Sequence, residues 1–297
     1  MTTHQSKTDF YQEVTNQIIE ALEQGIKPWS CPWDVSQASG IPSNFSTHSE
    51  YQGMNIMLLW MSAQLHRFSS SQWLTFKQAK ALEGQVRKGE KGTHIFFYKT
   101  VEKTSVNEKG KEVEESYPML KTYCVFNLDQ VEGIERPASI EAEGNHDIET
   151  LDNVEAFIAQ TGASLSYHGQ KAFFRPSTDE IVIPERERFH HTADLYATIM
   201  HELTHWTGHK SRLNRDSKGR FGSKDYAFEE LVAELGAAFL MADFGITGEV
   251  QHESYIASWL EVLKNDKRYI FKAATQASKA HQYLKAFLND HKTLEAA

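Results

Sequence analysis

The sequence predicts an α+β protein of two domains, and three observations lead to this fold class. The chain has 297 residues, of which 40% are hydrophobic, enough for one large domain or two ordinary ones. Both halves contain segments with helical spacing and segments typical of strands. The charge is uneven, since residues 1–130 carry 13 bases and 14 acids whereas residues 131–297 carry 18 bases and 26 acids. Such a difference in electrostatic character is typical of separate domains.

A polar, acidic stretch separates the two halves. Between Glu135 and Asp152 the sequence has six acids, one base and no aromatic residue. A segment of this kind cannot bury enough apolar surface to order itself, so we interpret it as a linker. The predicted organisation is a first domain at 1–133, an acidic linker at 134–152 and a second domain at 153–297.

The first half opens with an amphipathic helix. Apolar residues recur at helical spacing from Phe10 to Leu22, and Gly25 and Pro28 end the pattern. A second helix follows Gly53. The other elements predicted in this half are a helix ending near 84, strands over 94–99 and 123–127, and an exposed, highly charged hairpin tip over 103–115.

The second half has one short helix, then short strands, then long helices. The last of three predicted strands, 180–183, runs into Pro184, which suits the edge of a sheet. An edge strand can hold an extended peptide by strand addition, and an ordinary core strand is the equal alternative. The predicted elements are strands over 163–167, 172–175 and 180–183, and helices over 154–159, 193–207 and 224–243, with two more between 255 and 288.

The strongest functional signal is an H-E-x-x-H pattern formed by His201, Glu202 and His205. Residues four apart share a helix face, so both imidazoles can bind one cation. Zinc acidifies water at such a site, and Glu202 is placed to take the proton as the water attacks a carbonyl. Thr192 is expected to cap this helix and Gly208 to end it. The alternative is a pair of ordinary histidines on an amphipathic helix, but the glutamate-rich helix that follows favours a metal site.

A third ligand is expected from the helix predicted over 224–243, because hydrolytic zinc sites usually have three protein ligands. Glu230 and Glu234 share one face of this helix, whereas Glu229 points about a quarter turn away. One of the first pair is expected to ligate zinc, and Glu234 can hydrogen-bond a ligating histidine from behind. A metzincin-type site needs its third histidine at position 211, which is Ser211, so His209 remains a minor alternative.

Basic and aromatic residues cluster in the first half. Residues 77–99 contain six bases and two acids, with a glycine-punctuated basic loop at 84–92. Single-stranded nucleic acid stacks its bases on aromatic side chains while basic side chains follow its backbone. The alternative is that these aromatic residues belong to the core. A second basic stretch, 210–224, is either a solvated loop or a surface for an acidic partner. The candidate DNA-binding residues are Trp29, Trp33, Tyr51, Trp73, Lys77, Arg87, Lys88 and Lys91.

Composition excludes several other classes. A net charge of −9 argues against an even positive coat for duplex nucleic acid, although it permits a local basic groove. Cys31 and Cys124 are too few for a disulfide framework and lack the spacing of a thiolate zinc site. No apolar run approaches the ~20 residues that span a bilayer. We therefore expect a cytoplasmic protein without a membrane partner.

Several motifs in this chain occur together in one family. They are Trp29 and Pro32-Trp33; Asn44 with residues 51–55; residues 73–76; residues 84–93; residues 125–127; the H-E-x-x-H pattern; Gly208-His209; residues 211–215; and residues 229–235. With these motifs, nearly the whole chain resembles the ArdC antirestriction proteins of conjugative plasmids, which are related to the N-terminal region of plasmid TraC primases.

The resemblance implies an N-terminal domain that binds single-stranded DNA and a C-terminal zincin-like metallopeptidase domain. In related zincins the third ligand is the first acid of an E-x-x-A-[D/E] pattern, which residues 230–234 match. The resemblance therefore selects Glu230 over Glu229 as the ligand that joins His201 and His205, with Glu202 as general base. It further implies a role in protecting incoming plasmid DNA from restriction during conjugation.

Zinc is the expected cofactor, with another divalent metal such as Mn²⁺ as the alternative. Single-stranded DNA and an unidentified protein substrate are the expected partners. Two other functions stay open at this point. One is a single-stranded-DNA-binding protein with a structural or inert metal domain, and the other is a DNA-activated peptidase that acts on a host factor.

Overall fold

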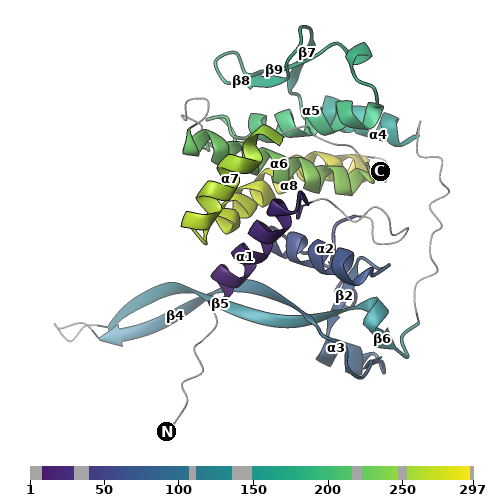
Figure 1. The fold of residues 1–297 in the computed structure, drawn as a ribbon. Helices are drawn as coiled ribbons and strands as arrows, with labels where there is room; N and C mark the ends of the chain where they lie inside the picture. Colours follow the sequence, from purple (N-terminus) through teal and green to yellow (C-terminus); the bar gives the residue numbers. More distant parts are fainter. Residues whose placement is uncertain are drawn as a thin grey trace.

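The molecule has a central layer of helices between sheets at opposite ends (Figure 1). This α+β architecture confirms the predicted fold class. The structure is a computed structural model that describes residues 9–29, 40–106, 112–135, 149–215, 223–246 and 253–294.

The first helices lie where their spacing predicts, α1 at Phe10–Glu23 and α2 at Met54–His66. Asp9 caps α1 by accepting a hydrogen bond from the backbone N–H of Gln12. At α3 (Phe76–Ala81), Thr75 and Gln78 form a capping box in which each side chain satisfies the other's backbone N–H. Local polar residues therefore fix the starts of α1 and α3.

The N-terminal sheet has the strand order β1-β2-β5-β4. The strands of its long hairpin extend further than predicted: both continue into the segment 103–115 that was expected to form the hairpin tip, and they pair from Thr93↔Val125 to Val106↔Glu112. The strands are β1 (Ser43–Asn44), β2 (Gln72–Thr75), β4 (Thr93–Val106) and β5 (Glu112–Asn127), and β3 (Gln85–Val86) pairs separately with β6 (Val131–Glu132).

The second half begins with α4 (Glu149–Gln160) and a sheet of order β7-β9-β8. Strand β9 (Glu180–Ile183) pairs with β7 (Ser164–Tyr167) on one side and with β8 (Phe173–Arg175) on the other. Of the two alternatives for 180–183, an edge strand or a core strand, the structure therefore shows the core strand. Pro184 lies beyond the last paired residue, so it removes no hydrogen bond from the ladder. The antiparallel strand β8 occupies an edge instead.

Helix α6 (Lys224–Phe244) is the central helix of the second half and packs on α5 (Thr192–Thr207), α7 (Glu253–Asn265) and α8 (Tyr269–Leu294). Helices α5 and α6 approach closely at Gly236, where a Cβ would lie 2.5 Å from the Cγ2 atom of Thr204. This contact needs glycine, and it brings the H-E-x-x-H helix against the glutamate-rich helix.

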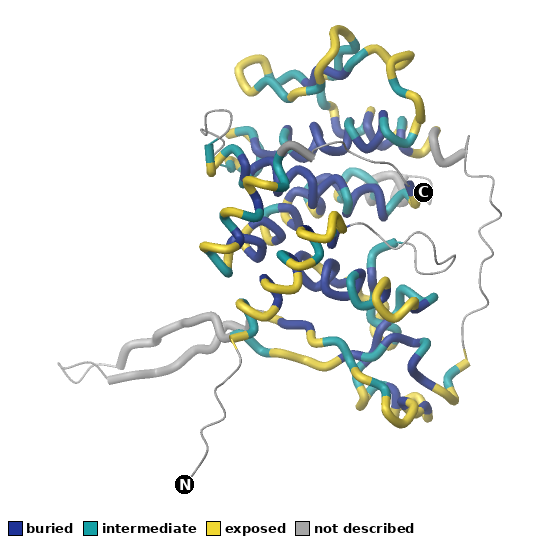
Figure 2. The backbone as a smooth tube through the Cα atoms, viewed as in Figure 1, coloured by how far each residue is buried: buried dark blue, intermediate teal, exposed yellow. Residues whose placement is uncertain are grey.

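The two halves of the chain share one hydrophobic core. Ile18 and Leu59 from the first half belong to the same buried cluster as Leu231 and Ala274 from the second half. Figure 2 shows the buried backbone running through the stacked helices. A second cluster lies between α5 and the small sheet, and a third under α3. Most of the predicted linker, residues 136–148, lies outside the described residues. None of the helices in the described ranges combines the length and apolarity needed to cross a membrane.

Candidate metal centre

Helix α5 carries His201, Glu202 and His205 on a buried surface. The predicted cap is wrong by one residue, because the N-cap is His191 and its side chain makes no capping hydrogen bond. Gly208 ends the helix as expected, in an ordinary right-handed conformation. Its Cβ position is 3.0 Å from Nη2 of Arg215 and from the carbonyl oxygen of His205, so a side chain there would be tightly packed.

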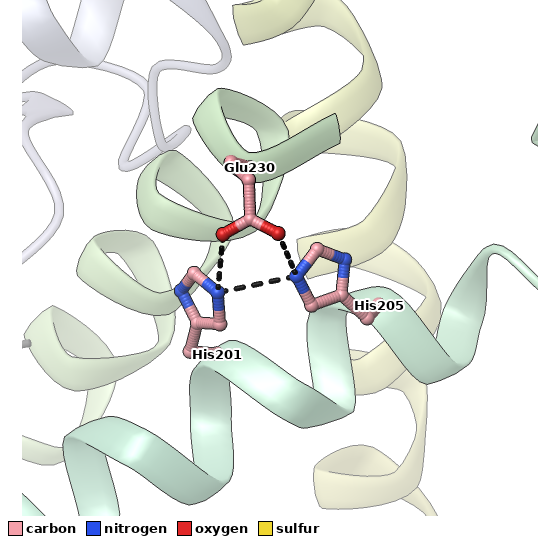
Figure 3. Close-up of side chains that lie close together, drawn as sticks. All are labelled: His201, His205 and Glu230. Atoms are coloured by element: carbon pink, nitrogen blue, oxygen red, sulfur yellow. Dashed lines mark hydrogen bonds and ion pairs between the residues drawn. The ribbon is translucent and has the colours of Figure 1, made fainter. Parts of the chain in front are cut away.

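The two imidazoles and the carboxylate of Glu230 converge on one point (Figure 3). The Nε2 atoms of His201 and His205 are 3.1 Å apart. The oxygens of Glu230 lie 3.6 Å from His201 Nε2 and 3.5 Å from His205 Nε2. The structure thus brings together the three residues selected as ligands by the resemblance, from two helices that contact at Gly236.

Each imidazole also has a carboxylate at its other nitrogen. His201 Nδ1 lies 3.8 Å from Glu234, and His205 Nδ1 lies 3.4 Å from Glu229. A carboxylate behind a histidine fixes the orientation of the ring and favours a lone pair on the opposite nitrogen. Glu234 lies behind His201 as its spacing from Glu230 suggests, but at 3.8 Å the two atoms are beyond hydrogen-bond distance. Glu229 was predicted as an alternative ligand or as a residue behind a ligand, and the structure places it behind His205.

The carboxylates of the cluster shift the pKa values of their neighbours. Burial disfavours the charged form of His205, but its hydrogen bonds to the carboxylates of Glu229 and Glu230 outweigh this effect and raise the pKa of His205 to about 10. Burial alone would raise the pKa of Glu230, yet the two histidines lower it well below its usual range. The cluster therefore favours positive charge at its centre.

Glu202 lies beside this cluster as a buried carboxyl group. Burial raises its pKa, although the neighbouring histidines oppose the shift. Its carboxylate accepts a hydrogen bond from the backbone N–H of Phe174 in β8. Its Oε2 atom has no hydrogen-bond partner among the described residues. A buried carboxylate oxygen without a partner is costly, so this atom is set up to interact with a molecule that enters the site.

Two tyrosines near the centre were not identified from the sequence. The pKa of Tyr226 is raised by burial, by Tyr255 and by Glu230. Its hydroxyl is 3.5 Å from that of Tyr255. Tyr226 precedes Glu230 by one helical turn, and this spacing is the signal that could have found it.

The basic stretch 210–224 begins with structural arginines rather than a free positive surface. Arg215 is buried, pairs with Glu229 at 2.7 Å and donates to the carbonyl of Thr204. Arg212 stacks 3.8 Å from the ring centroid of Trp206 and forms an ion pair with Asp179. Residues 216–222 lie outside the described part of the chain.

The candidate DNA-binding residues divide by burial. Trp29, Tyr51 and Trp73 are 2%, 6% and 1% exposed, so the structure favours the alternative that these three aromatic residues belong to the core. Trp33 lies outside the described residues. The four basic candidates, Lys77, Arg87, Lys88 and Lys91, are all exposed.

Other aromatic side chains do reach the surface of the N-terminal half. Phe97 and Tyr123 are 47% and 43% exposed, and their ring centroids are 5.5 Å apart on β4 and β5. Phe76 is also exposed. Composition alone does not show which aromatic rings are exposed. Side chains alternate between the two faces of a strand, and the sequence does not show which of these faces the helices cover.

Both halves of the chain match known families. Residues 8–126 match the N-terminal domain of the anti-restriction factor ArdC, and residues 152–276 match a zincin-like metallopeptidase. The metal-free crystal structure of the antirestriction ArdC protein from plasmid R388 superposes with a TM-score of 0.80 at 41% identity, covering 95% of this chain and 98% of that chain. The Mn(II)-bound structure of the R388 protein gives a TM-score of 0.76 at 41% identity, with coverage of 94% and 98%.

Two other proteins are similar to this chain over nearly all of its length. The protein y4eC of Sinorhizobium fredii is 37% identical over 298 residues, which cover 97% of this chain and 95% of y4eC. A DNA primase TraC of Escherichia coli is 35% identical over 95% of this chain, but the match spans only 20% of that primase. The chain therefore belongs to the ArdC family of antirestriction proteins, with an ArdC N-terminal domain followed by a zincin-like metallopeptidase domain.

Proposed function

We propose that the second half of the chain is a zinc-dependent peptidase, with His201, His205 and Glu230 as metal ligands. The observation that carries this proposal is the convergence of three donor atoms within 4.8 Å of one another at a buried site. Zinc ligands at about 2.0–2.2 Å in a tetrahedral arrangement are about 3.3–3.6 Å from one another. The separations of 3.5 and 3.6 Å from the imidazole nitrogens to the two oxygens of Glu230 fit this range, and the 3.1 Å between the imidazole nitrogens is slightly shorter. Two nitrogen donors and one carboxylate suit zinc, with Mn²⁺ as the alternative.

Glu202 is the general base in this proposal. Zinc, when bound, supplies a Lewis acid that polarises water and a carbonyl group. Glu202 accepts a proton from the attacking water, whose oxygen forms a bond to the carbonyl carbon. The proton then passes to the amide nitrogen as the carbon–nitrogen bond breaks, leaving a carboxylic acid and an amine. The raised pKa of Glu202 suits a group that must accept and return a proton near neutral pH.

Strand β8 is the proposed site for the peptide backbone. It lies at an edge of the small sheet, and its Phe174 contacts Glu202. A peptide added as a further strand along β8 would pass the general base. This replaces 180–183 as the element that holds the substrate.

A Glu202→Gln variant tests the peptidase activity. We expect it to keep bound zinc, measured by elemental analysis, and to lose cleavage of casein as a generic substrate and of itself. Glu187→Gln is the matched control, because Glu187 is an exposed acid of the same half. Equal antirestriction activity in Glu202→Gln and wild type, with no proteolysis by either, would instead support the alternative of an inert metal domain.

We further propose that the first half binds single-stranded DNA through the exposed faces of β4, β5 and the loop at 84–92. Lys121 is in register with Phe97 and two residues from Tyr123, so a basic and two aromatic side chains share one face of the hairpin. Phe97 also lines a pocket of about 460 Å³ together with Gln52 and Lys279. Aromatic rings beside basic side chains are the chemistry that grips single strands.

Affinity for an oligonucleotide of mixed sequence tests this surface. Phe97→Leu is expected to weaken binding by roughly 5- to 100-fold, because stacking on one base is worth about 1–3 kcal/mol, whereas Phe97→Trp keeps the stacking surface. Lys88→Ala should flatten the slope of log K against log salt by about 0.7. Lys171→Ala, an exposed lysine of the other half, is the control. Unchanged affinity and slope in Phe97→Leu and Lys88→Ala would reject this surface.

The biological role that we propose is protection of incoming plasmid DNA from restriction during conjugation, in the cytoplasm of the recipient. The support is membership of the ArdC family and the similarity to TraC primases. A DNA-activated peptidase remains the alternative, and it predicts that casein cleavage rises when the oligonucleotide is added. Survival of a transferred plasmid in a restricting host measures the protection directly.

A further inference from the structure

A segment of the N-terminal half reaches the candidate metal centre. Trp29 donates a hydrogen bond from Nε1 to Glu234 Oε1 at 3.4 Å, and Lys27 Nζ lies 3.3 Å from the same oxygen. Trp29 is 2% exposed and packs edge-on against Trp259 with ring centroids 5.6 Å apart. The indole therefore has one fixed orientation, with its N–H directed at the carboxylate.

Glu234 connects this segment to a candidate ligand. Its Oε1 atom contacts Lys27 and Trp29, while its Oε2 atom lies 3.8 Å from His201 Nδ1. Glu229 has the equivalent place behind His205, but its cation, Arg215, comes from the same half of the chain. The donors to Glu234 are more than 200 residues away in the sequence. One of the two histidines thus depends on the other half of the protein.

The physical role of these donors follows from burial. Glu234 is 5% exposed, and a buried carboxylate must be compensated by charge or by hydrogen bonds. With one oxygen held by Lys27 and Trp29, the other stays on the side of the imidazole, 3.8 Å from His201 Nδ1, which is an ion-pair separation rather than a hydrogen bond. A carboxylate in this position fixes the tautomer and the angle of a metal-binding histidine, and loss of such a partner typically costs 10- to 100-fold in metal affinity.

We propose that Lys27 and Trp29 are positioning residues of the metal centre, supplied by the N-terminal half and acting on His201 through Glu234. The proposal rests on the metal site of the proposed function. Coupling of this kind is reciprocal. A ligand that displaces the Lys27–Trp29 segment lowers metal affinity, and bound metal holds the segment in place. Lys27 and Trp29 therefore connect the N-terminal half directly to the metal centre.

Zinc affinity of the full chain, measured by competition with a chromophoric chelator, tests the proposal. Trp29→Phe removes the indole N–H but keeps an aromatic ring against Trp259, and we expect about 10- to 100-fold weaker zinc binding. Trp60→Phe is the matched control, because the Trp60 indole is equally buried and donates to the carbonyl of Gly40, away from the centre. Its zinc affinity should equal that of wild type.

Lys27 provides an independent variant that does not disturb a buried ring. Lys27→Met keeps the apolar stem and removes the charge, and we expect weaker zinc binding. Lys27→Arg is expected to keep most of the affinity. Lys264→Met, which breaks the exposed ion pair of Lys264 with Glu23, is the control for a lost surface charge. A loss in Lys27→Met that Lys27→Arg recovers supports a positioning role.

A double-mutant cycle separates positioning from general stability. If Trp29 acts through Glu234, then Trp29→Phe has little further effect on zinc affinity once Glu234→Gln is present. Additive losses in this cycle, or wild-type affinity in both Trp29→Phe and Lys27→Met, would overturn the inference. Failure of the metal site is a different result: wild type would then bind zinc no better than a His201→Ala variant.

Discussion

At the scale of single residues, the metal cluster uses both nitrogens of each imidazole. The Nε2 atoms face Glu230, and the Nδ1 atoms face Glu234 and Glu229. A carboxylate behind a metal-binding histidine favours the proton on Nδ1, which leaves Nε2 as the atom that a cation would bind. Each supporting carboxylate is in turn held by a basic side chain, which keeps a dense group of buried charges in balance.

Replacement of Arg215 tests this balance. Arg215→Met leaves Glu229 buried without its cation and removes the donor to the Thr204 carbonyl. Loss of one partner of a buried ion pair costs about 3–5 kcal/mol. We expect a loss of this size in the free energy of unfolding, measured by urea denaturation. The control is Arg175→Met, whose pair with Glu180 is partly exposed and should be worth at most about 1 kcal/mol. Equal losses in the two variants would contradict the prediction.

At the scale of elements, the approach of α5 to α6 sets the geometry of the site. Both helices are long enough to present their functional residues on one buried face, and Gly236 lets the backbones come together over Thr204. A larger side chain at this point would separate His201 from Glu230. The spacing of the helices is therefore part of the metal centre, although Gly236 is not a ligand.

Gly236→Ala is expected to destabilise the protein despite the higher helix propensity of alanine. The new Cβ would lie 2.5 Å from Thr204 Cγ2 and 2.8 Å from Thr204 Oγ1, so one helix must move. Overpacking of this kind costs about 1–3 kcal/mol, which outweighs the roughly 1 kcal/mol gained from propensity. Urea denaturation measures the loss, and a zinc competition assay should show weaker binding.

A second-site change provides the control for this clash. Thr204→Ser removes the methyl group that lies closest to the new Cβ, so Gly236→Ala should cost less in the Thr204→Ser background. The prediction fails if Gly236→Ala is as stable as wild type, or if the two changes add without recovery.

The elements show which parts of the structure can be predicted from the sequence. The spacing of apolar residues located α1, α2, α5 and α6, because this signal is local. The same reasoning placed His201 and His205 on one face. It left alternatives open where the answer depends on distant neighbours: β9 has strands on both sides, and Trp73 is buried. The contact of Trp29 with Glu234 spans 205 residues, so no local pattern reveals it.

At the scale of the whole molecule, polar contacts as well as the core join the two halves. Lys285 on α8 contacts both Glu50 of the N-terminal half and Asp243 on α6. His281 lies 2.6 Å from the same Asp243. These contacts add directional interactions to a shared apolar core, so the relative placement of the two halves is specified as well as stabilised.

Asp243 gives this junction a dependence on pH. Burial alone would raise the pKa of Asp243, but His281 and Lys285 outweigh it and lower the pKa below its usual value. A carboxyl group with a lowered pKa contributes stability above its unfolded pKa of about 3.9, and this contribution is lost as pH falls through the lower folded value. Asp243→Asn should therefore cost about 1.5–3 kcal/mol at pH 7 and reduce the loss of stability on acidification below about pH 4. Urea denaturation across pH measures both.

The control for the junction is an exposed acid with a cation partner. Asp266→Asn breaks the surface pair of Asp266 with Lys272, which should contribute at most about 1 kcal/mol. The loss of stability of this variant below about pH 4 should stay close to that of wild type. An Asp243→Asn variant with wild-type stability at pH 7 would contradict the role assigned to the junction.

The shared core predicts that the two halves unfold together. Residues of α1, α2, β4 and β5 lie in one apolar cluster with residues of α6, α7 and α8, so neither half retains a complete core without the other. We expect one thermal transition, with amides of α2 and of α6 exchanging hydrogen through the same global opening.

Zinc binding should shift this transition. Zinc at 100 times its Kd adds about 2.7 kcal/mol to the free energy of unfolding, which for a chain of this size raises the midpoint temperature by roughly 4 °C. Because the metal centre also contacts Lys27 and Trp29, the whole transition should move, and a His201→Ala variant should not respond to zinc. Two transitions, of which only one moves with zinc, would contradict a common core and would instead fit the two independent domains that the charge distribution predicts.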